Sequence, residues 1–180
     1  LMSKIGKINI SIPEKVKVLS TGNIINIEGP LGKKKLEIDT DLFDLIINDG
    51  KDVSIKPKKL SQNIKRLWGM NRSLLNNAII GASKGYEKIL ELSGVGFRAS
   101  LKDKQLNLQL GFSHDINFDI PEGIKINVEK QTIIKITGSD KQQVGMIASQ
   151  IKSIRPPEPY KGKGIKEQGQ YILRKEGKKK

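Results

Sequence analysis

Apolar and polar residues in the first half of the chain alternate in short runs, a pattern typical of β-strands. Glycine and proline in Gly29-Pro-Leu-Gly32 interrupt the pattern. Later the apolar residues recur every three or four positions, which predicts a helix ending near Gly81 and Gly85. The predicted strands are 16–19, 24–28, 34–38, 44–47 and 53–56, and the predicted core face of the helix is Ile64, Leu67, Trp68, Leu75, Ala78, Ile79 and Ala82.

The second half repeats this order of strands followed by a helix. Ser139-Asp-Lys-Gln142 matches a capping box, which predicts a helix start, and Pro156-Pro157 predicts its end. The predicted strands are 88–93, 97–101, 106–110, 116–120, 125–128 and 132–137, and the predicted core face of the second helix is Val144, Ile147, Ala148, Ile151 and Ile154.

The two strand-to-helix junctions, Val53-Ser-Ile-Lys-Pro57 and Ile134-Lys-Ile-Thr-Gly138, are alike. We therefore predict an α+β fold: a tandem duplication of an antiparallel β-sheet unit covered by one α-helix, followed by a basic C-terminal extension. The predicted domains are 1–84, 85–154 and 155–180. Each repeat is small for a lone core and is expected to be supported by its twin.

Composition excludes several classes of protein. The chain has 180 residues and a net charge of +14, which favours a nucleic-acid partner. It has no cysteine, so disulfides, thiolate metal sites and a cysteine nucleophile are excluded. No apolar run approaches the roughly 20 residues of a membrane span. Neither a signal-peptide core nor a transit peptide is visible, and no membrane partner is expected.

The positive charge lies in two places. Residues 51–72 hold seven basic residues against one acidic residue, and the segment from Arg155 holds nine against three. The first cluster is either a solvated surface or a contact with RNA or an adjacent protein. Its candidate contact residues are Lys58, Lys59, Lys65, Arg66 and Arg72.

The segment from Arg155 to Lys166 combines two prolines with alternating lysine and glycine, and leaves no room for a core of its own. Bare glycines let a backbone approach a partner closely, and ammonium groups suit phosphate oxygens. Tyr160 is expected to be exposed, either against a ribose or base or as a cap on the domain. Most other aromatic residues fall inside strand or helix patterns, with Phe97, Phe112 and Phe118 on strands. Recognition is therefore expected to use phosphate, 2′-OH and RNA shape. Deleting 155–180 is expected to abolish RNA binding and leave both repeats folded.

Two motifs imitate catalytic sites. Gly94-Val-Gly-Phe-Arg-Ala99 spells a dinucleotide-binding fingerprint, but the sequence after it predicts a strand, whereas the cofactor needs a helix. A bend or bulge is the alternative, with Arg98 as a further RNA or interface contact. His114 lies between Ser113 and Asp115, but three consecutive residues cannot form a triad. We predict no catalytic residue, no metal site, no cofactor and no enzymatic activity.

The block Arg155-Pro-Pro-Glu-Pro-Tyr-Lys-Gly-Lys-Gly-Ile-Lys166 resembles the C-terminal motif of the bacterial and organellar ribosomal protein L-six family. The resemblance extends to Ser3-Lys-Ile-Gly-Lys7, Ile12-Pro-Glu14, the Trp68-Gly69 helix with Arg72, and the Gly94 loop. It implies a duplicated α+β structural constituent of the large ribosomal subunit. The implied partner is the 3′ domain of the large-subunit (23S-type) rRNA.

The resemblance also implies a position near the stalk base and sarcin–ricin loop, with neighbouring large-subunit proteins and translational GTPases close by. The implied rRNA-binding residues are Arg155, Tyr160, Lys161, Gly162, Lys163, Gly164 and Lys166, and charge alone adds Lys178 and Lys179. The expected location is the ribosome of a bacterial cytoplasm or mitochondrial matrix, with a plastid also open.

Glu167 and Gln170 depart from the family, in which many members have an aromatic residue and an acid there. This departure places the RNA contacts of 167–170 in doubt. The alternative function is a non-ribosomal RNA-binding regulator, which would share the charge of the chain but bind many RNAs.

Overall fold

The computed structural model describes residues 4–48, 50–59 and 61–177, in which the chain forms two compact units. Unit 1 comprises the chain up to Gly85, with Ser139–Lys141. Unit 2 comprises Tyr86–Gly138 and the chain from Gln142 onward. Each unit has its own apolar core, so each is described separately.

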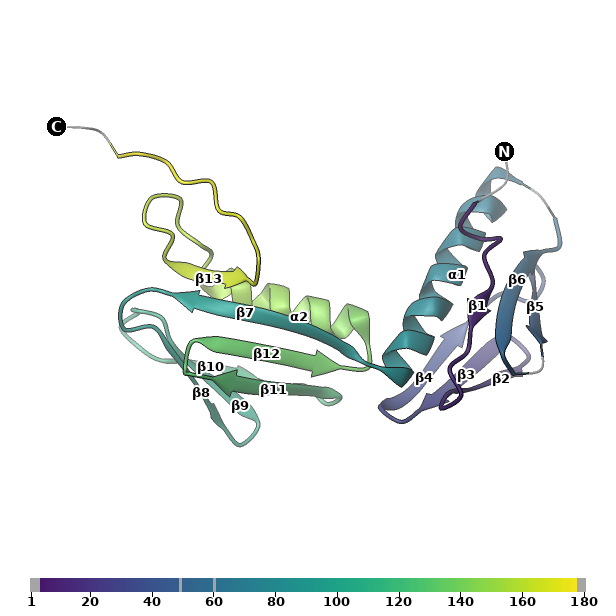
Figure 1. Ribbon diagram of the computed structural model, residues 1–180, viewed down its shortest axis with the longest axis horizontal. Coiled ribbons are helices and arrows are strands. Elements are labelled where there is room, and N and C mark those ends of the chain that lie inside the picture. Colours follow the sequence, from purple (N-terminus) through teal and green to yellow (C-terminus); the bar gives the residue numbers. More distant parts are fainter. Residues whose placement is uncertain (1–3, 49, 60, 178–180) are drawn as a thin grey trace. The chain divides into compact units, whose positions relative to one another are not determined.

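Unit 1 contains two antiparallel three-stranded sheets and one helix (Figure 1). One sheet has the order β1-β6-β5 and the other the order β2-β3-β4. Helix α1 packs against β3, β4 and β6 and so covers both sheets. The elements are β1 (Ile10–Ser11), β2 (Lys17–Thr21), β3 (Ile24–Gly29), β4 (Gly32–Glu37), β5 (Phe43–Asn48), β6 (Asp52–Pro57) and α1 (Gln62–Ser83).

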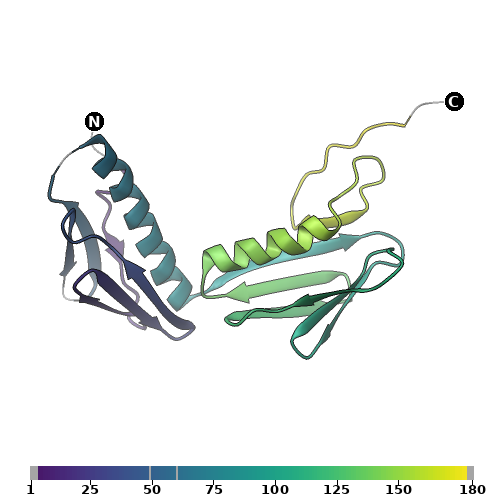
Figure 2. The same ribbon diagram turned by 180° about the vertical axis from the view of Figure 1, so that it is seen from behind.

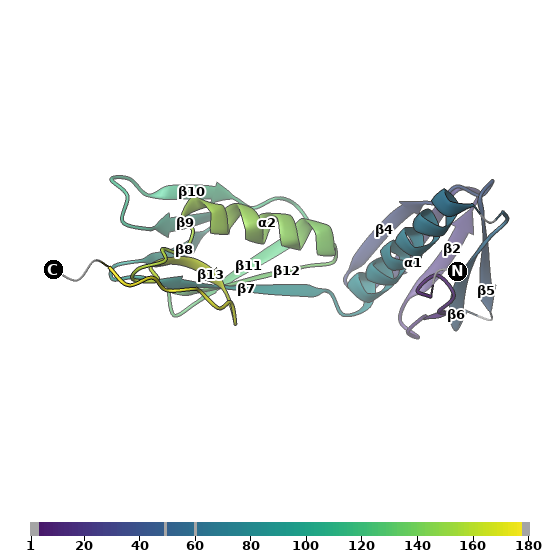
Figure 3. The same ribbon diagram turned by 90° about the horizontal axis from the view of Figure 1, so that it is seen from above.

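Unit 2 has a four-stranded sheet in the order β11-β12-β7-β13, a three-stranded sheet in the order β10-β9-β8, and helix α2. Figures 2 and 3 show α2 lying along the four-stranded sheet. The elements are β7 (Tyr86–Ser93), β8 (Arg98–Lys102), β9 (Gln105–Gln109), β10 (Ile116–Asp119), β11 (Ile124–Glu129), β12 (Ile133–Gly138), α2 (Lys141–Ile154) and β13 (Gly164–Glu167).

The two units share one topology. In unit 1 an edge strand pairs with β6, a three-stranded meander follows, and β5 and β6 pair before the helix. In unit 2, β7 takes the place of β1, β8 to β10 form the meander, and β11 and β12 pair before the helix. The prediction of a duplicated α+β fold with one helix on each repeat is therefore confirmed.

The predicted strand and helix patterns place the two cores correctly, with one exception on α1. Trp68 is buried, and its indole Nε1–H donates a 2.7 Å hydrogen bond to the carbonyl of Ile55. Leu67, predicted to face the core, is instead 37% exposed, while the polar Asn71 is buried. The error arose because a spacing of three or four residues does not fix the edges of the buried face.

The structure also corrects the sequence analysis at Phe112 and in the tail, which adds a strand to the four-stranded sheet of unit 2. Phe112 lies in a bend before β10 and is 41% exposed, so it is not a strand residue. The tail supplies strand β13, and Ile165 is fully buried in the core of unit 2. We therefore expect the deletion of 155–180 to destabilise unit 2 instead of leaving both repeats folded, because it removes a core residue and a strand.

Candidate nucleic-acid interface

The basic tail is attached to unit 2 by a sheet edge. Strand β13 pairs antiparallel with β7, with Ile165 opposite Leu92. The amide of Ile165 donates a 2.8 Å hydrogen bond to the carbonyl of Arg155, and the amide of Gln168 donates one to Ile89. The chain on both sides of residues 156–163 is therefore fixed on the sheet.

Between these attachments the chain forms a short loop, the tip loop, which comprises residues 158–163 (Figure 1). The amide of Glu158 donates a 2.7 Å hydrogen bond to the carbonyl of Lys163, and the amide of Gly162 donates a 3.0 Å bond to Glu158. The segment after β13 returns to this loop, because the amide of Lys175 donates a 2.9 Å bond to Pro159. The tip loop is therefore held in one conformation by the backbone.

The two glycines of the motif serve the loop itself. Gly164 has φ +138°, and a Cβ there would lie 2.6 Å from the Pro156 carbonyl oxygen and the Pro157 Cα. Gly162 has φ +71°, in the left-handed region that favours glycine. Both glycines are buried. The sequence analysis assigned their freedom to a close RNA approach, whereas the structure gives it an intramolecular use.

The tip loop presents an exposed ring and uncompensated cations. Tyr160 is 54% exposed, as predicted from its place in the motif. Lys161 is exposed, and Lys163 is partly exposed. Among the residues that the structure describes, neither ammonium group has an acidic partner. Both charges are therefore available to an anionic ligand.

Two other predicted contact residues are held by unit 2. The guanidinium of Arg155 lies over the ring of Phe112, 4.9 Å from its centroid, a cation–π geometry. The ammonium of Lys166 lies 3.0 Å from a Glu91 carboxylate oxygen, with about a third of each side chain exposed. The positive charge of Lys166 is thus partly neutralised, and Arg155 is held in place by an aromatic ring. Lys178 and Lys179 lie outside the described residues.

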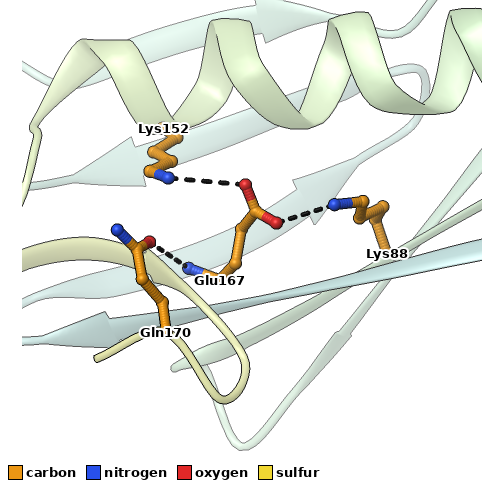
Figure 4. A network of polar contacts seen from close by, with 4 residues as sticks. All are labelled: Lys88, Lys152, Glu167 and Gln170. Atoms are coloured by element: carbon orange, nitrogen blue, oxygen red, sulfur yellow. Dashed lines mark hydrogen bonds and ion pairs between the residues drawn. The ribbon is translucent and has the colours of Figure 1, made fainter.

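Glu167 forms the centre of a polar network that joins β13 to β7 and α2 (Figure 4). Its carboxylate oxygens lie 2.7 Å from Lys88 Nζ and 3.4 Å from Lys152 Nζ. The Glu167 amide donates to the Gln170 side-chain oxygen. The hydrogen bond from Lys88 is the main cause that lowers the pKa of Glu167, and Lys152 contributes further. Of the two residues that depart from the family pattern, Glu167 therefore supports the attachment of the tail, and Gln170 holds the backbone of Glu167.

The structure adds three exposed residues that the sequence analysis did not select. Tyr171 is 84% exposed, and Arg174 and Lys175 are exposed without an acidic partner among the described residues. The Arg174 guanidinium lies beside the tip loop, 3.3 Å from where a Cβ on Gly162 would stand. Their charge was visible in the sequence, but only the return of the chain to Pro159 brings them to the loop.

The candidates of the first basic cluster, residues 51–72, fall into two groups: those with contacts within unit 1 and those without an acidic partner among the described residues. Lys58 pairs with Asp44 at 3.5 Å, and Arg72 Nε donates a 3.2 Å hydrogen bond to the carbonyl of Ile8. These two residues therefore have contacts within unit 1. The remaining candidates are at least partly exposed, and no acidic partner is found for them among the described residues: Lys59, Lys65 and Arg66 in this cluster, and Arg98 in unit 2.

The two catalytic motifs have no supporting geometry. The Gly94 loop leads into strand β8, so no helix N-terminus stands where a pyrophosphate would bind. His114 lies on an exposed bend. Within the described ranges, no group of three His, Cys, Asp or Glu residues is placed to hold a metal ion. Neither helix there is long and apolar enough to span a bilayer.

Comparison with known proteins agrees with this picture of the chain. The family model for ribosomal protein L6 matches residues 93–168, which include β7's last residue, the Gly94 loop, α2 and β13. Full-length relatives extend the similarity to both units. The large ribosomal subunit protein uL6 of Methylocella silvestris is 46% identical over 179 residues, covering 99% of this chain and 100% of the relative.

The uL6 proteins of Sphingopyxis alaskensis and Paramagnetospirillum magneticum are 45% and 46% identical over the same length and coverage. At this identity and coverage, both repeats and the tail have counterparts in each relative.

Proposed function

The chain belongs to the ribosomal protein L6 family, and on this basis we propose that it is a structural constituent of the large ribosomal subunit. The family is a structural, non-enzymatic component of the ribosome. The partners in this proposal are large-subunit rRNA and neighbouring large-subunit proteins. The relatives come from bacteria, so the proposed location is the bacterial cytoplasm.

The finer part of the proposal is that unit 2 binds the 3′ domain of the 23S-type rRNA, near the stalk base and the sarcin–ricin loop. Translational GTPases would then dock close to the chain. The observation that carries this proposal is the tip loop: a rigid, exposed turn whose lysines have no acidic partner in the described part of the chain. A loop of fixed shape with free ammonium groups suits a folded RNA backbone.

Each proposed contact residue has a distinct role in this proposal. Lys161 and Lys163 bind phosphates, and Tyr160 packs on a ribose or base. Arg155, held by Phe112, and Lys166, partly neutralised by Glu91, contribute at the edge of the contact. Arg174 and Lys175 extend the basic surface beside the loop. Gly162 and Gly164 set the shape of the loop, and Lys178 and Lys179 add charge at the C-terminus.

The test is the salt dependence of binding to a transcript of the rRNA 3′ domain. Each phosphate contact adds roughly one unit to the slope of log K against log salt concentration. We expect Lys161→Ala with Lys163→Ala to lower that slope by about 2 at most. A filter-binding titration at several salt concentrations measures it.

Lys102→Ala with Lys104→Ala is the matched control, because these two lysines are exposed at the end of β8 and in the turn that follows it, in the same unit, and are also two residues apart. The control removes the same net charge and is expected to change the slope much less. An equal change in both variants would mean that the tip loop makes no specific phosphate contact.

A further inference from the structure

Unit 1 carries an acidic hollow in an otherwise basic protein. The hollow has a volume of about 530 Å³ and is lined by Asn23, Glu37, Asp39, Asp41, Leu67 and Asn71, among others. No lysine or arginine occurs among its described lining residues. None of its three carboxylates forms an ion pair with another described residue. Three uncompensated carboxylates repel RNA phosphates and attract cations.

The backbone around the hollow is fixed. The amide of Ile38 donates a 2.8 Å hydrogen bond to Asn23, and the amide of Phe43 donates a 3.1 Å bond to Asp39. The Asp39 carboxylate accepts a 2.9 Å bond from the amide of Asp41. The carboxylates therefore stand on a preorganised loop, which lowers the ordering cost of binding.

Asn71 adds an uncharged polar group to the hollow. This α1 residue is 9% exposed and lines the hollow, and its side-chain amide has no hydrogen-bond partner among the described residues. No buried side-chain polar atom of the described chain lacks a partner, so the amide reaches solvent through the hollow. A partner that enters the hollow can therefore bond to this amide as well as to the carboxylates.

An apolar stripe on α1 continues from the hollow. Leu67, Met70 and Leu74 are 37%, 50% and 44% exposed, and their spacing of three and four residues places them on one side of the helix. Leu67 also lines the hollow. At 100° per residue, Lys65 and Arg72 lie on the opposite flank of α1. The exposed Arg66 lies one turn before Met70, at the outer edge of the stripe, so the apolar stripe has the carboxylates on one side and a single arginine on the other.

We propose that the hollow and the stripe together form a docking surface for a basic, amphipathic segment of another protein. Lysine or arginine side chains of that segment enter the hollow beside Glu37, Asp39 and Asp41, and its apolar side chains cover Leu67, Met70 and Leu74. The three carboxylates repel phosphates, so charge complementarity favours a basic protein segment over RNA as the occupant. This proposal rests on the proposed function in one respect only, namely that the two proteins bind each other on the large ribosomal subunit.

Photo-cross-linking in living cells tests this surface. p-Benzoyl-phenylalanine is placed at Met70, and in a second strain at Met146 on α2 of unit 2, which is 51% exposed against 50% for Met70. After irradiation the ribosomal and soluble fractions are separated and the cross-linked peptides are sequenced. We expect the probe at position 70 to capture one protein segment rich in lysine or arginine, which position 146 does not capture.

Charge reversal of the hollow then tests the chemistry. Glu37→Lys with Asp41→Lys leaves the hydrogen bond to the Asp39 carboxylate intact and is expected to reduce the cross-link about tenfold or more. The unfolding midpoint followed by Trp68 fluorescence checks that unit 1 stays folded. A cross-link to rRNA, to an acidic segment or to no other molecule overturns the proposal, as does an undiminished cross-link after charge reversal. A basic segment captured in the soluble fraction supports the surface and contradicts only the ribosomal location.

Discussion

Units 1 and 2 share one topology and differ at two places, each of which carries the special surface of that unit. In the helices, Leu75, Ala78, Ile79 and Ala82 of α1 have the same spacing as Val144, Ile147, Ala148 and Ile151 of α2, and all eight are buried. With these positions matched, residues 62–71 of α1 precede the start of α2. Helix α1 accordingly has 22 residues and α2 has 14.

The extra part of α1 holds Lys65, Arg66, Leu67, Met70 and Asn71, and so contributes to the basic flank and the acidic hollow of unit 1. Unit 2 instead has an added strand, β13, on the far side of β7, whereas β1, the counterpart of β7, is an edge strand among the described residues. A duplicated scaffold has therefore kept its topology and diversified at the ends of its elements, where each addition brings a buried residue of its own, Trp68 in α1 and Ile165 in β13.

The largest expected effect comes from removing the anchor of the added strand. Ile165→Ala truncates a fully buried side chain in the core of unit 2 and should lower its free energy of unfolding by about 3 kcal/mol. Unit 1 should be unaffected. Hydrogen exchange of the β7 and β12 amides reports on unit 2, and fluorescence of Trp68, the single tryptophan, reports on unit 1.

Ile172→Ala is the control for Ile165→Ala. Ile172 lies in the tail and is only partly buried, outside the core cluster of unit 2. It should change the hydrogen exchange of β7 by much less than Ile165→Ala. If Ile165→Ala altered neither unit, β13 would not contribute to the stability of unit 2. The added strand would then not be a structural difference between the two units that matters for folding.

A smaller effect is expected in unit 1 from Gly6→Ala. A Cβ at Gly6 would lie 2.5 Å from Trp68 Cδ2, and the indole cannot move freely because it is buried and bonded to Ile55. The crowding should lower the free energy of unfolding of unit 1 by about 2 kcal/mol, as measured by Trp68 fluorescence.

Gly145→Ala in unit 2 provides the contrast. Apart from the adjacent residues and the neighbouring backbone of α2 itself, no atom lies within 4 Å of a Cβ at that position, so the substitution should stabilise the helix by about 0.5–1 kcal/mol. If Gly145→Ala lowered the free energy of unfolding, or if Gly6→Ala left it unchanged, the space around each glycine would not be what decides the effect of its substitution.

The sequence predicted the duplicated strands and helices because their periodicity is local, but it did not reveal β13. Gly164–Glu167 contains one apolar residue, Ile165, and its pairing with β7 is a long-range contact that no pattern of period two could show. For the same reason the lysines of the tip loop were found from charge, whereas the proximity of Arg174 and Lys175 was not. The acidic hollow of unit 1 was missed as well, because Glu37, Asp41 and Asn71 come together only in the folded unit.

The smallest expected effect concerns Glu167 and the polar network of β13. Because Lys88 and Lys152 lower the pKa of Glu167, the ionised carboxylate stabilises unit 2 at neutral pH. That contribution is present above the unfolded-state pKa of about 4.3 and is lost as the pH falls through the lower folded-state pKa. Since the side chain is 35% exposed, solvent screening limits the contribution to about 1 kcal/mol or less.

Glu167→Gln should therefore destabilise unit 2 slightly at pH 7. The difference should vanish in acid, once the carboxylate of the wild-type Glu167 is protonated. Urea unfolding at several pH values measures this difference, with Glu122→Gln as the control, since Glu122 is exposed and has no ion-pair partner among the described residues. A pH-independent difference would mean that Glu167 acts through packing or neutral hydrogen bonds, and that the strand peculiar to unit 2 is held by the burial of Ile165 alone.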